Sequence, residues 1–166
     1  RGARVLAMCG ESSEATVLSN ELAKRFPDAT FTIHVSLPVI AAADALARLQ
    51  PAKAIELLLP VKLYDSAPSA EFWPNYLRGQ AYLQLKNGRG AADQFQSIVD
   101  REGEVPSAVL YPLAHLGLAR AAALMNDTKT ALGAYEQFFA LWKQPDPDLR
   151  LFTEARVEYD RLRGQK

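Results

Sequence analysis

Apolar residues recur at helical spacing along most of the chain, in segments that come in pairs separated by short turns. One segment carries Leu77, Ala81 and Leu85 at this spacing, and Asn87-Gly88 is predicted to end it because both residues tolerate a left-handed backbone. A second apolar face starts again at Ala91. The pattern therefore predicts an all-α chain built from helical hairpins.

The hairpins repeat at a nearly fixed period. Ala15, Ala54, Ala91 and Ala131 hold the same place in four aligned segments and lie 39, 37 and 40 residues apart. Three prolines repeat in phase early in the leading helix of a pair: Pro38, Pro74 and Pro112. Each proline is expected either to start its helix or to kink it. A period of this size is typical of a solenoid of stacked units, so we expect an α-α superhelical solenoid of about three and a half helix pairs with a C-terminal capping helix.

The period makes residues 1–166 a single array. Its units are expected over about 1–28, 32–65, 70–103 and 107–144, and the capping helix over about 148–163. The first unit is incomplete, and the chain opens in mid-helix without an initiator Met, so we expect a piece of a longer protein. The last segment has one apolar stripe under a charged face, as a capping helix needs: Phe152, Ala155, Tyr159 and Leu162.

Composition and charge narrow the function classes. The chain is 49% hydrophobic and 23% charged, with 19 Lys+Arg and 19 Asp+Glu. A surface without basic excess disfavours nucleic acid as a partner. No apolar run reaches the roughly 18 residues that span a bilayer, so we expect no membrane insertion. The single cysteine, Cys9, ends an apolar stretch and is predicted to be a buried structural thiol.

No pattern of catalytic or ligand-binding residues stands out. His34, His115 and Cys9 lack the spacing of a metal site, and the segment Asn87–Gly90 lacks the ending of a phosphate-binding loop. No paired carboxylates or nucleophile-base set are recognisable. We therefore expect no catalytic residue, no metal and no cofactor in this chain, and predict that it is not an enzyme by itself.

The repeating units resemble tetratricopeptide repeats (TPR). The third unit supplies Gly79-x2-Tyr82 and Ala91-x3-Phe95, and the fourth supplies Ala131-x3-Tyr135, whereas no unit has the family's Trp. Four segments together are similar to the C-terminal TPR region of bacterial eukaryotic-like serine/threonine protein kinases and of winged-helix regulators: Glu21–Pro27, Pro51–Leu58, Tyr76–Tyr82 and Leu141–Asp148.

This resemblance implies a protein-binding module of a larger bacterial signalling protein, with a serine/threonine kinase domain upstream. In TPR arrays the leading helices line a concave groove that holds a protein or peptide. The matching positions are Arg4, Ser36, Val39, Ala43, Trp73, Tyr76, Gln80, Gln84, Leu113 and Arg120. An alternative is self-association, such as a homodimer, or docking within the longer protein through an apolar edge around Leu6, Val17 and Leu18.

Overall fold

The computed structural model describes residues 1–105, 109–142, 146 and 149–164, and no strand occurs among them. The α-helices are α1 (Gly2–Met8), α2 (Ser12–Arg25), α3 (Leu37–Ala47), α4 (Pro51–Leu58), α5 (Trp73–Gln84), α6 (Gly88–Val99), α7 (Leu110–Leu124), α8 (Thr128–Leu141) and α9 (Arg150–Arg163). A π-helical turn, η1 (Thr32–Ser36), and two 3₁₀ turns, η2 (Pro60–Tyr64) and η3 (Pro68–Ala70), complete the set. The predicted all-α fold is confirmed.

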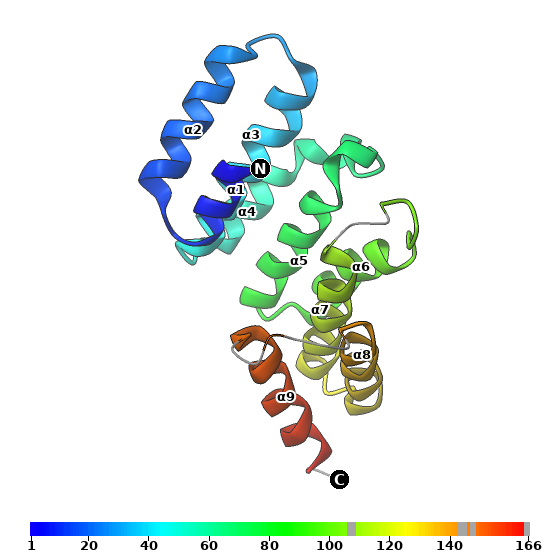
Figure 1. The fold of residues 1–166 in the computed structure, drawn as a ribbon. Helices are drawn as coiled ribbons and strands as arrows, with labels where there is room; N and C mark the ends of the chain where they lie inside the picture. The colour runs from blue at the N-terminus through cyan, green and yellow to red at the C-terminus, as the bar shows by residue number, and fades with distance from the viewer. Residues whose placement is uncertain (106–108, 143–145, 147–148, 165–166) are drawn as a thin grey trace.

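The helices form two layers of a solenoid. The leading helices α1, α3, α5 and α7 pack against one another in chain order, and each also packs on its own partner helix, α2, α4, α6 or α8. The partner helices pack in turn on the leading helix of the following pair. Figure 1 shows the pairs following one another along one direction, from the blue N-terminal helices to the red α9, which packs on α8.

Every turn between a leading helix and its partner has the same backbone geometry. One residue in each turn is left-handed: Gly10 (φ 84°), Leu49 (φ 57°), Lys86 (φ 59°) and Asn126 (φ 60°). The N–H of that residue and the N–H of the next one both donate to carbonyls of the preceding helix, as in the last pair, where Asn126 donates to Ala123 and Asp127 to Ala122. The four left-handed residues share the 39, 37 and 40 spacing of the alanines, so the repeat is a repeat of backbone geometry.

The third turn differs from its prediction. Lys86, and not Asn87 or Gly88, is the left-handed residue after α5. Asn87 instead caps the next helix, because its side-chain oxygen accepts from the N–H of Gly90 at 2.9 Å. Asp127 caps α8 in the same way, because its side-chain oxygen accepts from the N–H of Thr130 at 3.1 Å. Cys9, predicted to be buried, is exposed because it lies at the end of α1 beside the turn.

The four repeating alanines are equivalent in the structure. Each is the fourth residue of its partner helix and is buried, and its N–H closes the first helical turn onto the residue before the helix: Ala15, Ala54, Ala91 and Ala131. A methyl side chain at this point lets the two helices of a pair cross closely. The three prolines also hold similar positions, each in the first turn of a leading helix. Pro38 and Pro74 are the second residues of α3 and α5, and Pro112 is the third residue of α7.

A buried arginine fixes the long connection between α4 and α5. Arg78 is 1% exposed, and its guanidinium donates to the Leu58 carbonyl, to the Gln94 side chain and to the Asp65 carboxylate. Arg101 donates to the backbone carbonyl of Asp65 from the other side at 2.7 Å. The connection that contains η2 and η3 is therefore held to α4, α5 and α6 by charge-assisted hydrogen bonds.

The ring of Phe95 on α6 lies between two leading helices that approach it without side chains. A Cβ at Gly79 or at Gly117 would lie 2.6 Å from this ring, closer than carbon atoms can pack. Gly133 on α8 offers a contrast, because a Cβ there would meet no heavy atom within 4 Å. The glycines of α5 and α7 are therefore required by packing, whereas Gly133 is not.

Gly79→Ala and Gly117→Ala should each lower the free energy of unfolding by about 1–3 kcal/mol, because the added methyl must displace Phe95. Gly133→Ala, a matched control in an exposed helix interior, should raise it by up to about 1 kcal/mol. Denaturant unfolding followed by circular dichroism measures all three. Full stability of both Gly79→Ala and Gly117→Ala would contradict the packing described here.

Leu49→Gly should raise the free energy of unfolding by about 0.5–1 kcal/mol. Leu49 is left-handed and its side chain is 77% exposed, so glycine relieves backbone strain and removes little packing. Leu49→Ala is the control, since it removes the side chain and keeps the strain. Equal stability of the two variants in the same denaturation experiment would show that the turn is not strained at this residue.

Candidate functional site

Two consecutive left-handed residues place Trp73 at the start of α5. Glu71 has φ 50° and Phe72 has φ 63°, a conformation that costs about 1–3 kcal/mol for each non-glycine residue. Phe72 is buried, and the guanidinium of Arg101 lies 4.9 Å from the centre of its ring. The packing of Phe72 holds the chain in this strained turn, and Trp73 follows at a fixed angle.

Arg4 reaches from the first leading helix to the third. Its guanidinium carbon lies 3.8 Å from the centre of the Trp73 ring, a cation–π contact that passes over α3. The Nε atom of Arg4 is buried and has no hydrogen-bond partner. Burial lowers the pKa of Arg4 to about 10, and the charge of Glu71 opposes this shift. Arg4 is thus a half-buried cation whose Nε has no acceptor among the residues that the structure describes.

A groove runs beside this contact. One hollow of about 360 Å³ and an adjoining one of about 210 Å³ share four lining residues, Arg1, Arg4, Glu71 and Trp73. Arg1 and Glu71 form an ion pair across them. The larger hollow is otherwise lined mostly by apolar side chains from α2, α3 and the segment before it, namely Leu22, Phe31, Val35, Val39 and Ile40. We call these two hollows the N-terminal groove segment.

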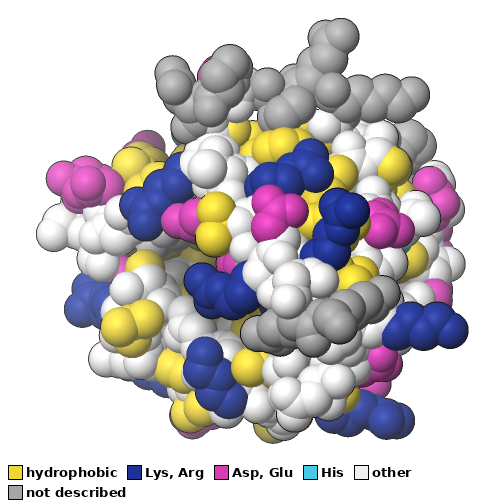
Figure 2. Space-filling model, turned by 90° about the horizontal axis from the view of Figure 1, so that it is seen from below, with side chains coloured by type: hydrophobic (Ala, Val, Ile, Leu, Met, Phe, Trp, Pro, Cys, Tyr) yellow, Lys and Arg dark blue, Asp and Glu magenta, His cyan; other side chains and the backbone are white. Residues whose placement is uncertain are grey.

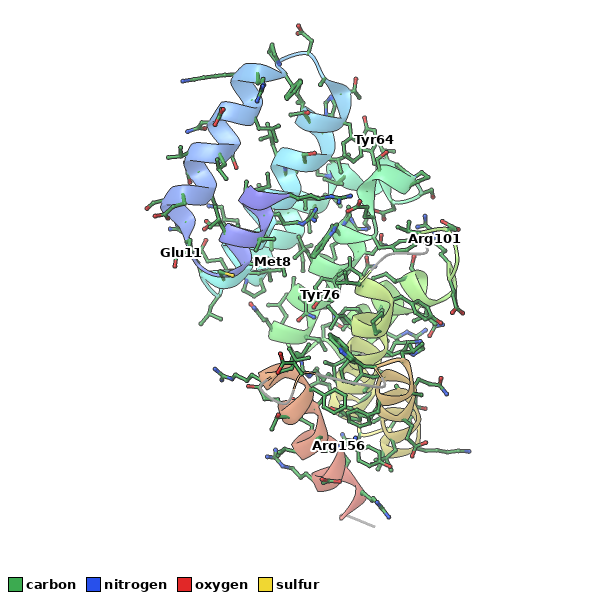
Figure 3. The ribbon with its side chains drawn as sticks, in the orientation of Figure 1. Met8, Glu11, Tyr64, Tyr76, Arg101 and Arg156 are labelled. Atoms are coloured by element: carbon green, nitrogen blue, oxygen red, sulfur yellow. The ribbon has the colours of Figure 1, made fainter. Side chains whose placement is uncertain are left out.

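Tyr76 lies on α5 in the middle of the molecule (Figure 3). Its ring makes edge contacts with Trp73 at 5.9 Å and with Phe95 at 6.0 Å between centroids. Burial raises the pKa of the Tyr76 hydroxyl, whereas the charge of Arg120 and a hydrogen bond with Gln80 lower it in part. Tyr76 therefore contacts Trp73 and lies within electrostatic range of Arg120.

Arg120 on α7 is paired with the last helix. Its Nε and Nη2 atoms donate to the two carboxylate oxygens of Glu158 on α9, both at 2.9 Å, and the Tyr135 hydroxyl donates to Glu158 Oε2 at 2.7 Å. Burial alone would lower the pKa of Arg120, but the hydrogen bonds and charge of Glu158 outweigh it and raise this pKa. Burial, together with Glu158, raises the pKa of Tyr135.

A third hollow, of about 420 Å³, lies beside this pair, and we call it the C-terminal groove segment. α7 contributes Arg120, Ala123 and Leu124 to it. Its other lining residues come from the end of α5 and the following turn, from α8 and from α9: Leu83, Lys86, Tyr135, Glu158, Arg161 and Leu162. On α9, Ala155 is buried, and the Arg156 guanidinium lies 3.9 Å from the centre of the Phe139 ring, which together hold that wall in place.

The structure brings some of the predicted groove residues together and separates others. Arg4, Ser36, Val39 and Trp73 line the N-terminal segment, and Arg120 lines the C-terminal one. Ala43 is buried in the core, and Leu113 is half-buried between two apolar clusters. Gln84 is exposed and donates to the Leu46 carbonyl at 3.2 Å.

Sequence reasoning missed the residues that complete both segments: Arg1, Glu71, Lys86, Glu158 and Arg161. Glu71 and Lys86 lie in turns, outside the helical register used to select groove positions. Glu158 and Arg161 lie on α9, whose charged face was interpreted as a solvent-exposed cap. These two residues could have been found from the sequence if α9 had been aligned with the leading helices, since it follows a partner helix as they do.

We also searched the described residues for metal-binding, titratable and membrane-spanning features. No group of three His, Cys, Asp or Glu side chains among them lies close enough to hold a metal ion. His115 is buried with its ring against Tyr111, 5.1 Å between centroids, and burial lowers its pKa although Glu102 opposes the shift. Among the described helices, none has both the length and the apolar character to cross a bilayer.

Comparisons with models of protein families, with curated proteins and with solved structures found no match to this chain.

Proposed function

We propose that this chain is a non-catalytic protein-interaction module, a TPR-like array whose leading-helix groove binds an extended or helical segment of another protein. The observation that carries the proposal is the half-buried Arg4 guanidinium over the Trp73 ring, at the rim of an apolar hollow that both side chains line. Arg4 is half-buried and lines this hollow, so a carbonyl or carboxylate of a ligand would pair with its positive charge there.

The composition of the groove supports binding of protein. Trp, Tyr and Arg are the residues most enriched among binding hot spots, and Arg4, Trp73 and Tyr76 are adjacent along one face. The N-terminal groove segment has the size of a pocket for one or two side chains, and its apolar lining favours their burial. The polar side chains of its lining would orient the ligand: Arg1, Arg4, Ser36, Ser69 and Glu71.

The placement of the module in a larger bacterial signalling protein, with a serine/threonine kinase domain upstream, is part of the same proposal. It is supported by the sequence resemblance of segments such as Glu21–Pro27 and Tyr76–Tyr82. The regular stack of hairpins agrees with this role, because solenoids present extended surfaces to other chains.

The test is selection of binders from a displayed library of random peptides against the immobilised 166-residue chain. We expect enriched peptides, and the Trp73→Ala/Tyr76→Ala double variant should bind them at least about tenfold more weakly, because both aromatic anchors are lost. Fluorescence anisotropy of labelled peptides gives the affinities.

Leu63→Ala is the matched control, since Leu63 is the most exposed large apolar residue of η2 and lies outside both groove segments. Thermal unfolding of each variant separates loss of binding from loss of fold, and Arg4→Ala supplies a second groove variant if the double variant unfolds. The proposal fails if no peptide is enriched, or if the folded groove variants bind as tightly as the parent.

Self-association is a second candidate function, and one observation favours it. α1 and α2 expose Val5, Met8, Val17 and Leu18 together, with Val17 65% exposed. A shallow hollow beside them is lined by Leu6, Ser13, Glu14, Val17 and Leu18. This is the apolar edge predicted from the sequence, and such a patch is suited to pairing with a second copy or with another part of a longer protein.

Sedimentation velocity over a range of concentrations tests this candidate. If the edge pairs two copies, the chain should show a concentration-dependent dimer, and Val17→Ser/Leu18→Ser should shift it to monomer because the apolar contact is removed. Leu63→Ser is a control with similar loss of exposed apolar surface elsewhere. A chain that stays monomeric at every concentration contradicts pairing between copies.

A further inference from the structure

The charges of the C-terminal groove segment do not balance. Three cations line it, Lys86, Arg120 and Arg161, against one carboxylate, Glu158. Glu158 is fully engaged, because both its oxygens accept from Arg120 and one also accepts from Tyr135. Lys86 and Arg161 are exposed and form no ion pair with any residue that the structure describes. Two positive charges thus face this segment of the groove, and no described residue of its lining supplies a counter-charge to them.

The remaining lining is apolar and partly open to solvent. Leu83 and Leu162 are half-buried, and Leu124 is 37% exposed. These side chains come from α5, α9 and α7, three helices that present different walls of one hollow of about 420 Å³. Apolar walls edged by cations suit an amphipathic ligand, one with apolar side chains for the walls and carboxylates for the edge.

We propose that the C-terminal groove segment docks an acidic amphipathic segment of a partner protein. Carboxylates of that segment pair with Lys86 and Arg161, and its apolar side chains lie against Leu83, Leu124 and Leu162. The inference rests on the proposed function of the groove and names the class of partner. The Arg120–Glu158 pair stays closed in the complex and separates the docking site from Tyr76.

The same lining disfavours nucleic acid. A phosphate backbone is bound by a run of cations, but Glu158 lies between Arg120 and Tyr135, and about half of the lining residues are apolar. Figure 2 views the molecule from the end where α9 lies in Figure 1 and shows Lys and Arg side chains mixed with apolar and acidic ones. Charge complementarity here is local and matches a short acidic stretch.

The test analyses the sequences of peptides enriched on the 166-residue chain from a random displayed library. We expect Asp and Glu to be enriched next to Leu, Ile or Phe, relative to the input library. Lys86→Glu/Arg161→Glu should weaken the binding of such a peptide about tenfold and select Lys- and Arg-containing peptides instead. Binding to the parent chain should weaken as salt is raised, since the pairing charges are exposed.

Lys24→Glu/Lys129→Glu is the matched control, because it makes the same change in net charge at two positions that do not line this groove segment. It should leave the affinity within about twofold of the parent. Leu124→Asp is a second site variant, and it should weaken binding by placing a carboxylate beside the apolar walls. Thermal unfolding of each variant shows whether it is folded.

The outcomes separate this inference from the proposed function. Enriched peptides without acidic bias, or equal binding to the parent and to Lys86→Glu/Arg161→Glu, overturn the inference and leave groove binding standing. Displacement of the peptide by a random single-stranded oligonucleotide, with tighter binding of that oligonucleotide, also overturns it. The absence of any enriched peptide overturns the proposed function and the inference with it.

Discussion

The left-handed turn between the helices of each pair is the constraint on which the rest of the structure depends. Two backbone hydrogen bonds close this turn in the same way after α1, α3, α5 and α7, and the residue that makes the second bond is also the residue before the next helix. The crossing point of the two helices therefore falls a fixed number of residues later, at Ala15, Ala54, Ala91 and Ala131. Equal crossings orient the leading helices alike, so that they pack side by side in chain order.

Two arginine side chains add polar links between elements that also share apolar core. Arg78 bridges α4, α5 and the connection between them, and Arg120 bridges α7 and α9. A buried guanidinium stabilises such a junction only when acceptors satisfy its donors, and both arginines meet this condition. Arg4 does not, since its Nε is buried without a partner. Arg4 lies in the N-terminal groove segment, where a ligand could contact it.

Much of the helical architecture could be predicted from the sequence, because alanine spacing and the Asp127 cap report directly on local geometry. The turns could not, since Leu49 and Lys86 hold a left-handed conformation that their side chains disfavour and that the neighbouring hydrogen bonds impose. The buried position of Ala43 and the exposure of Cys9 depend on how neighbouring helices lie, which helical periodicity does not specify. For the same reason Glu158 became recognisable as a groove residue only in three dimensions.

The two groove segments differ in what a ligand would have to supply. In the N-terminal segment the protein presents the half-buried cation Arg4 beside Trp73 and apolar walls, so a ligand would supply an acceptor together with apolar side chains. In the C-terminal segment Arg120 is already satisfied by Glu158, and only the exposed charges of Lys86 and Arg161 are left for a partner. Exposed charges favour encounter and orientation more than affinity, whereas a buried acceptor and aromatic anchors favour a long-lived complex. A partner that spans both segments would therefore be oriented at α9 and retained at Trp73.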